Sequence, residues 1–214
     1  MNETAKCSML AHRRHSKMRR QLSRAPCIVK SQIAVLLCAA MLAAAPRQIN
    51  TTTSILTVHV HKAGVLSGLG GHDHEINAPI ASGMVDTGAR TVDIRVNAAT
   101  LKVADSGASE KDSDEIRKTM LGPAVLDSQR YSEITFRSKS AESLGENAWR
   151  VQGDLTLHGE TGPVETEVRE ADGHYRGTIR LRQTQFGIKP VKVAGGTVRV
   201  KDEIAIDFDI QLSR

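Results

Sequence analysis

From residue 54 onward, apolar and polar residues alternate along most of the chain. The longest such run lies near the C-terminus, where every second residue is apolar: Ile204, Ile206, Phe208, Ile210 and Leu212. Successive side chains of a strand point to opposite faces, so this alternation predicts strands with one apolar face and one solvated face. Shorter runs with the same period lie at residues 92–96, 151–157, 164–168 and 179–181.

Turn-forming residues separate these runs. Asp172-Gly173 lies between two of them and favours a two-residue type I′ hairpin turn. Glycine marks four more expected turns, at residues 86–90, 144–147, 159–163 and 195–196. Such short connections favour antiparallel strands over βαβ units. The predicted fold is all-β, an antiparallel up-and-down β-barrel of about eight strands, with an interior that is filled by side chains or holds a small ligand.

One segment, Ser109–Leu121, departs from the period of two. Its acidic residues come early and its basic residues late, which is the charge order that a helix dipole favours. Ser109 or Ser113 can cap its N-terminus. Ile116 and Met120 stand four residues apart and so share one face. We therefore expect one short helix whose apolar pair lies against the barrel or covers one of its ends.

Residues 1–45 differ from the rest of the chain in charge. They hold eight Lys or Arg and one acid, Glu3, for a net charge of +7. Thirteen apolar residues follow the basic stretch at 33–45, which is the length of a signal-peptide core and short for a membrane span. We therefore expect a signal peptide at 1–45 and a periplasmic or secreted protein. An uncleaved N-terminal anchor is the alternative.

Residues 46–214 are expected to form a single domain, whose composition excludes several functions. This segment holds 21 basic and 23 acidic residues, a net charge of −2, although the whole chain carries +5. A nucleic-acid-binding domain needs a basic face, so this class is disfavoured. All three cysteines (Cys7, Cys27, Cys38) lie in the leader. The domain therefore has no disulfide, cysteine nucleophile or cysteine-based zinc site.

Three strings in this domain are similar to those of the YceI-like family, periplasmic lipocalin-like barrels associated with polyisoprenoid lipids. Gly153–Gly159 reads GDLTLHG and is followed by Pro163-Val164, as in the family pattern. Tyr131–Phe136 (YSEITF) and Phe186–Ile188 (FGI) supply the other two strings, in the family's order. The resemblance extends over about residues 55–212. Ser54–His61 departs from the family's usual first strand, which opens with a His-Ser pair.

This resemblance implies a protein that sequesters or carries a long apolar lipid inside the barrel, such as an isoprenoid quinone or a polyprenyl phosphate. The inward apolar residues of the strands are the candidates for ligand contact: Val60, Ile94, Ile134, Phe136, Leu155, Leu157, Ile179, Leu181, Phe186, Ile206 and Phe208. A filled barrel has the same alternation. A periplasmic domain that acts through a protein partner therefore remains a further alternative.

Histidines offer a competing site. His59 and His61 share one face of the first strand, and His72 and His74 have the same spacing in a glycine-flanked loop. Two such pairs close together can supply the three or four ligands that zinc needs, so a periplasmic metal-binding barrel is the alternative function. His158 is instead expected to fix the turn beside it.

Catalytic motifs are absent from the sequence. It contains no G-x-S-x-G, no H-E-x-x-H and no glycine-rich phosphate loop. Asp112 and Asp114 are paired acids, but at a helix start such residues are typical partners of the helix dipole. The sequence thus predicts a binding protein that is not an enzyme and uses no cofactor beyond a bound isoprenoid lipid or quinone.

Overall fold

The computed structural model describes residues 45–63, 73–104, 109–193 and 198–213. The chain divides into two units, Met1–Ala40 and Met41–Arg214, and every described residue belongs to the second. Apart from Ala45, the expected signal peptide lies outside the described residues. So do His72 and the expected turn at Gly195-Gly196.

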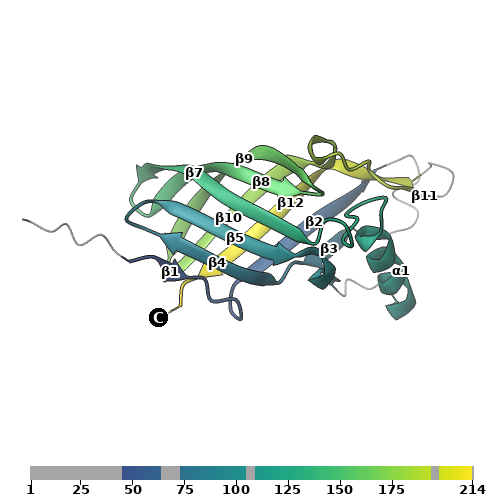
Figure 1. The fold of residues 1–214 in the computed structure, drawn as a ribbon, viewed down its shortest axis with the longest axis horizontal. Helices are drawn as coiled ribbons and strands as arrows, with labels where there is room; N and C mark the ends of the chain where they lie inside the picture. The colour runs from purple at the N-terminus through teal and green to yellow at the C-terminus, as the bar shows by residue number, and fades with distance from the viewer. Residues whose placement is uncertain (1–44, 64–72, 105–108, 194–197, 214) are drawn as a thin grey trace, which may run out of the picture. The chain divides into compact units, whose positions relative to one another are not determined.

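Twelve strands form one antiparallel sheet (Figure 1). They are β1 (Arg47–Gln48), β2 (Ile55–Ala63), β3 (His74–Asn77), β4 (Ile80–Asp86), β5 (Thr91–Asn97), β6 (Lys102–Val103), β7 (Glu133–Gly145), β8 (Ala148–Leu157), β9 (Glu160–Ala171), β10 (His174–Arg182), β11 (Lys192–Val193) and β12 (Val198–Gln211). Their order is β1-β4-β5-β7-β8-β9-β10-β12-β2-β3-β6, with β11 paired to β12. The all-β antiparallel class is confirmed. The expected count of about eight is wrong, because β1, β6 and β11 have two residues each and β3 has four, too few to give a clear period in the sequence.

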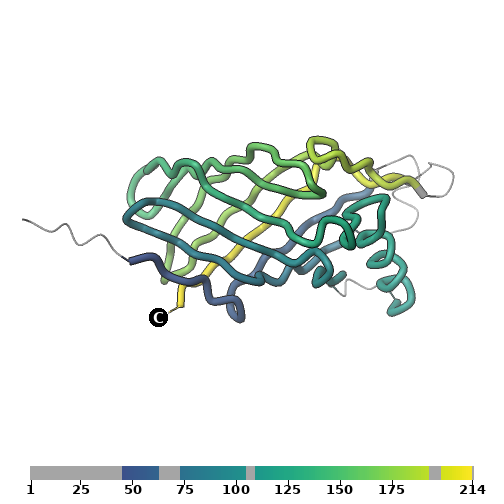
Figure 2. The backbone as a smooth tube through the Cα atoms, in the orientation of Figure 1, coloured from purple at the N-terminus to yellow at the C-terminus, as the bar shows by residue number. Residues whose placement is uncertain are grey.

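The sheet curls so that its early and late strands meet. β1 pairs with β4, and the next residue, Ile49, forms a bridge with Leu212 just after β12. The Asn50 backbone N–H donates to the Gln211 carbonyl oxygen at 2.8 Å. Figure 2 shows the backbone near residue 50 running beside the C-terminal end. The segment that contains β1 therefore connects β4 to β12.

Two hairpin turns have the left-handed backbone of type I′. Asp172 and Gly173 have φ values of 55° and 79° and join β9 to β10 as predicted. His158 and Gly159 have φ values of 53° and 78° and join β8 to β9. The turn expected at residues 159–163 is thus only partly correct, because it begins one residue earlier and ends at Gly159.

Gly162 and Pro163 lie within β9 instead of in the turn. A Cβ atom on Gly162 would lie 3.2 Å from Cε1 of Phe186, so the glycine makes room for this ring. Pro163 is exposed, and β9 pairs with β10 only over residues 168–171. The N-terminal half of β9 therefore has one side free of β10, where a proline costs no hydrogen bond to that strand.

The expected helix is confirmed as α1 (Glu110–Leu121). Ser109 caps it, because its hydroxyl oxygen accepts from the Asp112 backbone N–H at 3.2 Å. Met120 is buried and packs in the main apolar core, where Leu126 joins it. The described segments also contain two short 3₁₀ helices, η1 (Ala98–Thr100) and η2 (Gln183–Phe186). Figure 1 shows α1 at one end of the curled sheet. Among the described residues, no helix has the length and apolar character needed to span a membrane.

Candidate ligand-binding cavity

The inward faces of the strands enclose a cavity of about 310 Å³. This volume falls within the usual range of small-molecule sites. The strand register forms its wall: Phe136 pairs with Leu155, and Ile206 pairs with Val58 on one side and Ile179 on the other. All five side chains line the cavity, so the inner wall is continuous across several strands and strongly apolar.

Two glycines make room for aromatic rings along this wall. A Cβ atom on Gly153 would lie 2.6 Å from Cε2 of Phe136, and one on Gly177 would lie 2.5 Å from Cζ of Phe208. Real Cβ atoms do not approach that closely, so each ring occupies the space of the missing side chain. Both phenylalanines line the cavity. The two glycines therefore help to set its width.

Nine of the eleven candidate contact residues lie on the cavity wall: Val60, Ile94, Ile134, Phe136, Leu155, Leu157, Ile179, Ile206 and Phe208. Leu181 and Phe186 do not, although both are buried, at 3% and 1% exposure. Phe186 lies in η2 against Gly162, and Leu181 and Phe186 both belong to the packed core. Ligand contact by these eleven residues remains a prediction.

The structure adds lining residues that were not among the candidates. Some lie on strands and have the same period of two, so the alternation could have found them: Leu56, Val58, Ile76, Val96 and Val151. Others come from α1 and irregular segments, where no such period exists: Leu101, Met120, Val125, Leu126 and Ile188. Trp149, the single tryptophan of the chain, and Tyr175 also line the cavity, and their ring centroids lie 6.2 Å apart.

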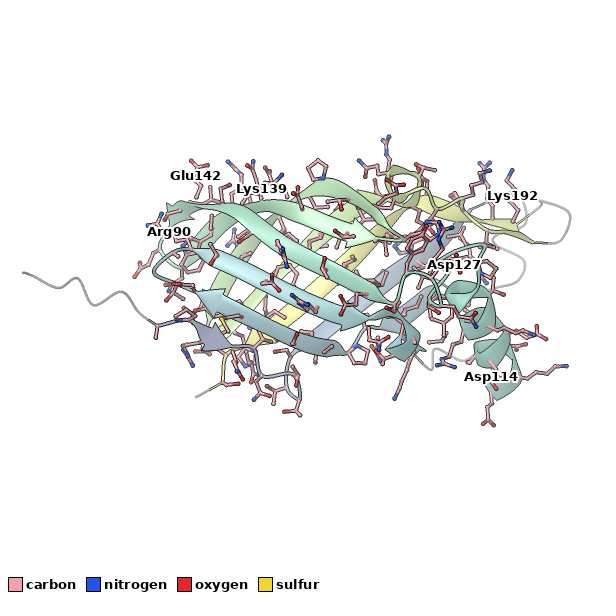
Figure 3. The ribbon with its side chains drawn as sticks, viewed as in Figure 1. Arg90, Asp114, Asp127, Lys139, Glu142 and Lys192 are labelled. Carbon is pink, nitrogen blue, oxygen red and sulfur yellow. The ribbon has the colours of Figure 1, made fainter. Side chains whose placement is uncertain are left out.

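The cavity has a polar, exposed end at the β4–β5 turn. Asp86, Thr87, Arg90 and Thr91 line it there, and the last three are exposed. Asp86 orders the turn, since its Oδ1 accepts from the Ala89 backbone N–H at 2.8 Å. Arg90 has a left-handed φ of 56°. At the other end the lining includes buried residues at and beyond α1, and Figure 3 shows Arg90 far from Asp114 of that helix.

The three strings that resemble the YceI-like family meet at one point. The rings of Tyr131 and His158 make an edge contact with centroids 4.9 Å apart. His158 Nδ1 lies 3.2 Å from the Phe186 carbonyl oxygen, within hydrogen-bond distance. The Tyr131 ring also covers Gly159, where a Cβ atom would lie 2.8 Å from Cδ1 of the ring. His158 thus belongs to the turn itself and ties it to η2.

Two of the histidines considered as metal ligands, His59 and His61, pair with carboxylates. His59 Nε2 lies 2.9 Å from Asp207 Oδ2, and His61 Nδ1 lies 2.8 Å from Asp73 Oδ2. The hydrogen bond from His61, followed by one from the Lys62 backbone N–H, lowers the pKa of the Asp73 carboxyl. His74 begins β3 opposite Val60.

No group of three or more potential metal ligands occurs among the described residues. The distances around His59 give a physical reason, since its Nδ1 lies 3.7 Å from Glu75 Oε1 while its Nε2 already contacts Asp207. Its two ring nitrogens thus contact different carboxylates, and the three groups do not converge on one point. The described part of the chain therefore does not favour the alternative metal site. One of its candidate ligands, His72, lies outside the described residues.

Asp209 on β12 is held by two donors. Burial raises the pKa of its carboxyl, but hydrogen bonds from Arg176 and His174 outweigh burial, and the pKa is lowered. Arg176 Nε lies 2.8 Å from Oδ2, and His174 Nδ1 lies 2.6 Å from Oδ1. Asp209 does not line the cavity, and this cluster joins β10 to β12 beside it.

An antiparallel sheet curled around an apolar cavity defines a class of proteins, the barrel-like β proteins with an internal pocket. The family model of the YceI-like domain matches residues 48–212, so the chain belongs to the YceI-like family. The resemblance drawn from the three strings is thereby confirmed.

Curated relatives are similar to parts of the chain. A UPF0312 protein of Vibrio cholerae is 30% identical over 114 residues, which cover 48% of this chain and 56% of the relative. A UPF0312 protein of Pseudomonas syringae pv. tomato is 40% identical over 74 residues, which cover 30% and 38%. The chain thus spans about half the length, or less, of the curated relatives it matches.

The crystal structure of Burkholderia cenocepacia BcnA is similar in fold. It has a TM-score of 0.54 and 17% identity, and the match covers 78% of this chain and 99% of that one. The Campylobacter jejuni YCEI protein matches with a TM-score of 0.44 and 12% identity over 72% of this chain and 85% of that one.

Proposed function

We propose that this protein binds a long apolar lipid, of the isoprenoid type, in the cavity and carries or sequesters it outside the cytoplasm without chemical conversion. The observation that carries this proposal is the continuous apolar wall that eight long strands and the α1 end place around about 310 Å³. Membership of the YceI-like family supports it, together with the sequence resemblance to lipid-associated barrels.

The apolar wall is sufficient to provide useful affinity. Each buried methylene group contributes about 0.8 kcal/mol, so about ten of them contribute roughly 8 kcal/mol before ordering costs. Before those costs are subtracted, that gross free energy corresponds to a dissociation constant of about 1 μM. The exposed polar end, with Thr87 and Arg90, is where we expect the ligand to enter.

Solvent extraction tests the proposal directly. Protein purified without denaturant should release an isoprenoid-like molecule into organic solvent, identified by mass spectrometry. Trp149 gives a second readout, because this single tryptophan lines the cavity and its fluorescence should change when a C20 prenyl lipid is added. Protein that releases no lipid and shows no saturable change with the prenyl lipid would contradict the proposal.

A pair of neighbouring variants separates cavity binding from adsorption to the surface. Ala141 lines the cavity, whereas Ser140 is exposed on the same strand. Ala141→Phe adds a ring inside the cavity and should weaken prenyl-lipid binding at least tenfold. Ser140→Phe adds the same ring outside and should leave binding unchanged. Equal effects of the two variants would reject the cavity as the binding site.

Export of the protein is part of the proposal. The +7 leader with its apolar core at residues 33–45 supports it. Fusion of residues 1–45 to alkaline phosphatase, which is active only after export, should give activity in bacterial cells. A fusion in which charged residues interrupt the apolar core should be inactive. Equal activity of both fusions would contradict export by this leader.

A further inference from the structure

Two polar side chains are buried among the described residues, and both line the cavity. Thr166 and Gln183 are each 7% exposed. The Thr166 hydroxyl donates to the Thr178 carbonyl oxygen at 2.9 Å, so the protein itself satisfies this group. Gln183 differs, because its amide has both a donor side and an acceptor side to satisfy.

The orientation of the Gln183 side-chain amide follows from the one hydrogen bond that it makes with the described residues. Nε2 lies 2.8 Å from the Lys201 carbonyl oxygen. A carbonyl oxygen only accepts, so the NH₂ group must face Lys201 and Oε1 is left as the acceptor. No described residue donates to Oε1. With Nε2 engaged, Oε1 is the side-chain atom of Gln183 that can accept a hydrogen bond from a ligand in the cavity that this residue lines, and a ligand that brings a donor gains by supplying it.

Gln183 also has a definite place along the cavity. It follows β10, whose last residue, Arg182, pairs with Glu203. The first residues of β10 pair with the C-terminal end of β12, next to the bridge that joins Leu212 to β1. The strand register therefore places Gln183 at the α1 end of the cavity, opposite the exposed end at Arg90.

We propose that Gln183 Oε1 accepts a hydrogen bond from a hydroxyl group at the inner end of the ligand. The ligand class is an apolar chain alcohol that enters hydroxyl first, because a hydroxyl group is a donor and the remaining wall at this end is apolar. A quinone ring offers only acceptors and would leave Oε1 without a partner. This inference rests on the proposed function and specifies the ligand class of the same cavity.

A matched pair of ligands tests the inference. Geranylgeraniol has a hydroxyl donor, and geranylgeranyl methyl ether has the same chain without it. Titration of each against Trp149 fluorescence should give an affinity about threefold to tenfold higher for the alcohol, the contribution of one hydrogen bond. Equal affinities for the two ligands would overturn the inference and leave the proposed function intact. Failure of both ligands to bind would count against both.

Two glutamine variants assign the preference to one side chain. Gln183→Leu keeps the size and removes the acceptor, so the ratio of alcohol to ether affinity should fall below twofold. Gln185→Leu makes the same change in η2 at an exposed residue and should keep the full ratio. A ratio that survives in Gln183→Leu would overturn the inference. Circular dichroism checks that each variant is folded. If a variant does not fold, the ratio of alcohol to ether affinity in the unmodified protein still tests the inference.

Discussion

Phe208 packs over Gly177, its partner across β10 and β12. A Cβ atom on Gly177 would lie 2.5 Å from Cζ of this ring and would also collide with the carbonyl oxygen of Glu167. Phe208 lines the cavity as well. The glycine thus holds the ring against the sheet and keeps it out of the space inside.

Gly177→Ala should therefore destabilise the fold and narrow the cavity. Overpacking of this kind typically costs about 1–3 kcal/mol, which urea unfolding measures. The displaced ring should also weaken prenyl-lipid binding. Combining Gly177→Ala with Phe208→Leu should recover part of the loss in unfolding free energy, because the smaller side chain can move aside. The full loss persisting in the double variant would show that the ring is not the cause.

Gly159 and Gly173 give a second, internally matched prediction. Both are the second residue of a type I′ turn, with φ values of 78° and 79°, so alanine pays the same left-handed penalty of about 1–2 kcal/mol in each. Only Gly159 is covered by the Tyr131 ring, whereas a Cβ atom on Gly173 would meet nothing within 4 Å.

Gly159→Ala should therefore lower the free energy of unfolding by about 1–3 kcal/mol more than Gly173→Ala. Chemical denaturation of the two variants measures this difference. Adding Tyr131→Leu to each variant serves as the control, and it should reduce the difference in unfolding free energy between them. Equal losses in Gly159→Ala and Gly173→Ala would mean that the Tyr131 contact adds no constraint on the turn.

The period of two predicted the strand walls because each inward residue repeats at every second position, as Leu155 and Leu157 do. The period of two could not distinguish residues that line the cavity from residues of the packed core. Ile179 and Leu181 share a face, but only Ile179 lines the cavity. That distinction depends on how η2 and α1 fill one end of the sheet. Met120 has no period of two, but its helical spacing from Ile116 predicted that it would lie against the barrel, and it packs in the core there.

Contacts between distant segments could not be predicted from the sequence either. The contact of Tyr131 with His158, and of His158 with Phe186, depends on strand register and on the position of η2, which no local pattern encodes. Gln183 was missed for a related reason. A polar residue at the end of an alternating run is typical of a turn, and only the three-dimensional fold buries it against the cavity.

Asp209 should make stability depend on pH. Its pKa in the folded protein is lowered from the ordinary value of 3.8, so its contribution is present above that value and is lost as the pH falls through the folded pKa. Asp209→Asn removes this contribution and should cost about 1 kcal/mol at pH 7. The difference in unfolding free energy between the two proteins should narrow below about pH 4, since the unfolded state binds its proton first.

Urea unfolding at a series of pH values from 7 to 3 measures this difference. Asp172→Asn is the control for net charge, because it removes one carboxylate at an exposed hairpin turn where asparagine suits the left-handed backbone. It should change the unfolding free energy at pH 7 by less than about 0.5 kcal/mol. If the difference in unfolding free energy between Asp209→Asn and the unmodified protein stays constant down to pH 3, the proposed stabilising role of the Asp209 carboxylate is contradicted.

The two serines that could cap α1 are expected to respond in opposite ways to alanine. The Ser109 hydroxyl oxygen accepts from the Asp112 backbone N–H, so Ser109→Ala should destabilise the protein by about 0.5–2 kcal/mol. Ser113 Oγ is buried and has no hydrogen-bond partner among the described residues. Ser113→Ala removes an unsatisfied polar group and improves helix propensity, so thermal unfolding should show an unchanged or higher melting temperature. A lower melting temperature in Ser113→Ala than in Ser109→Ala would contradict this assignment of the cap.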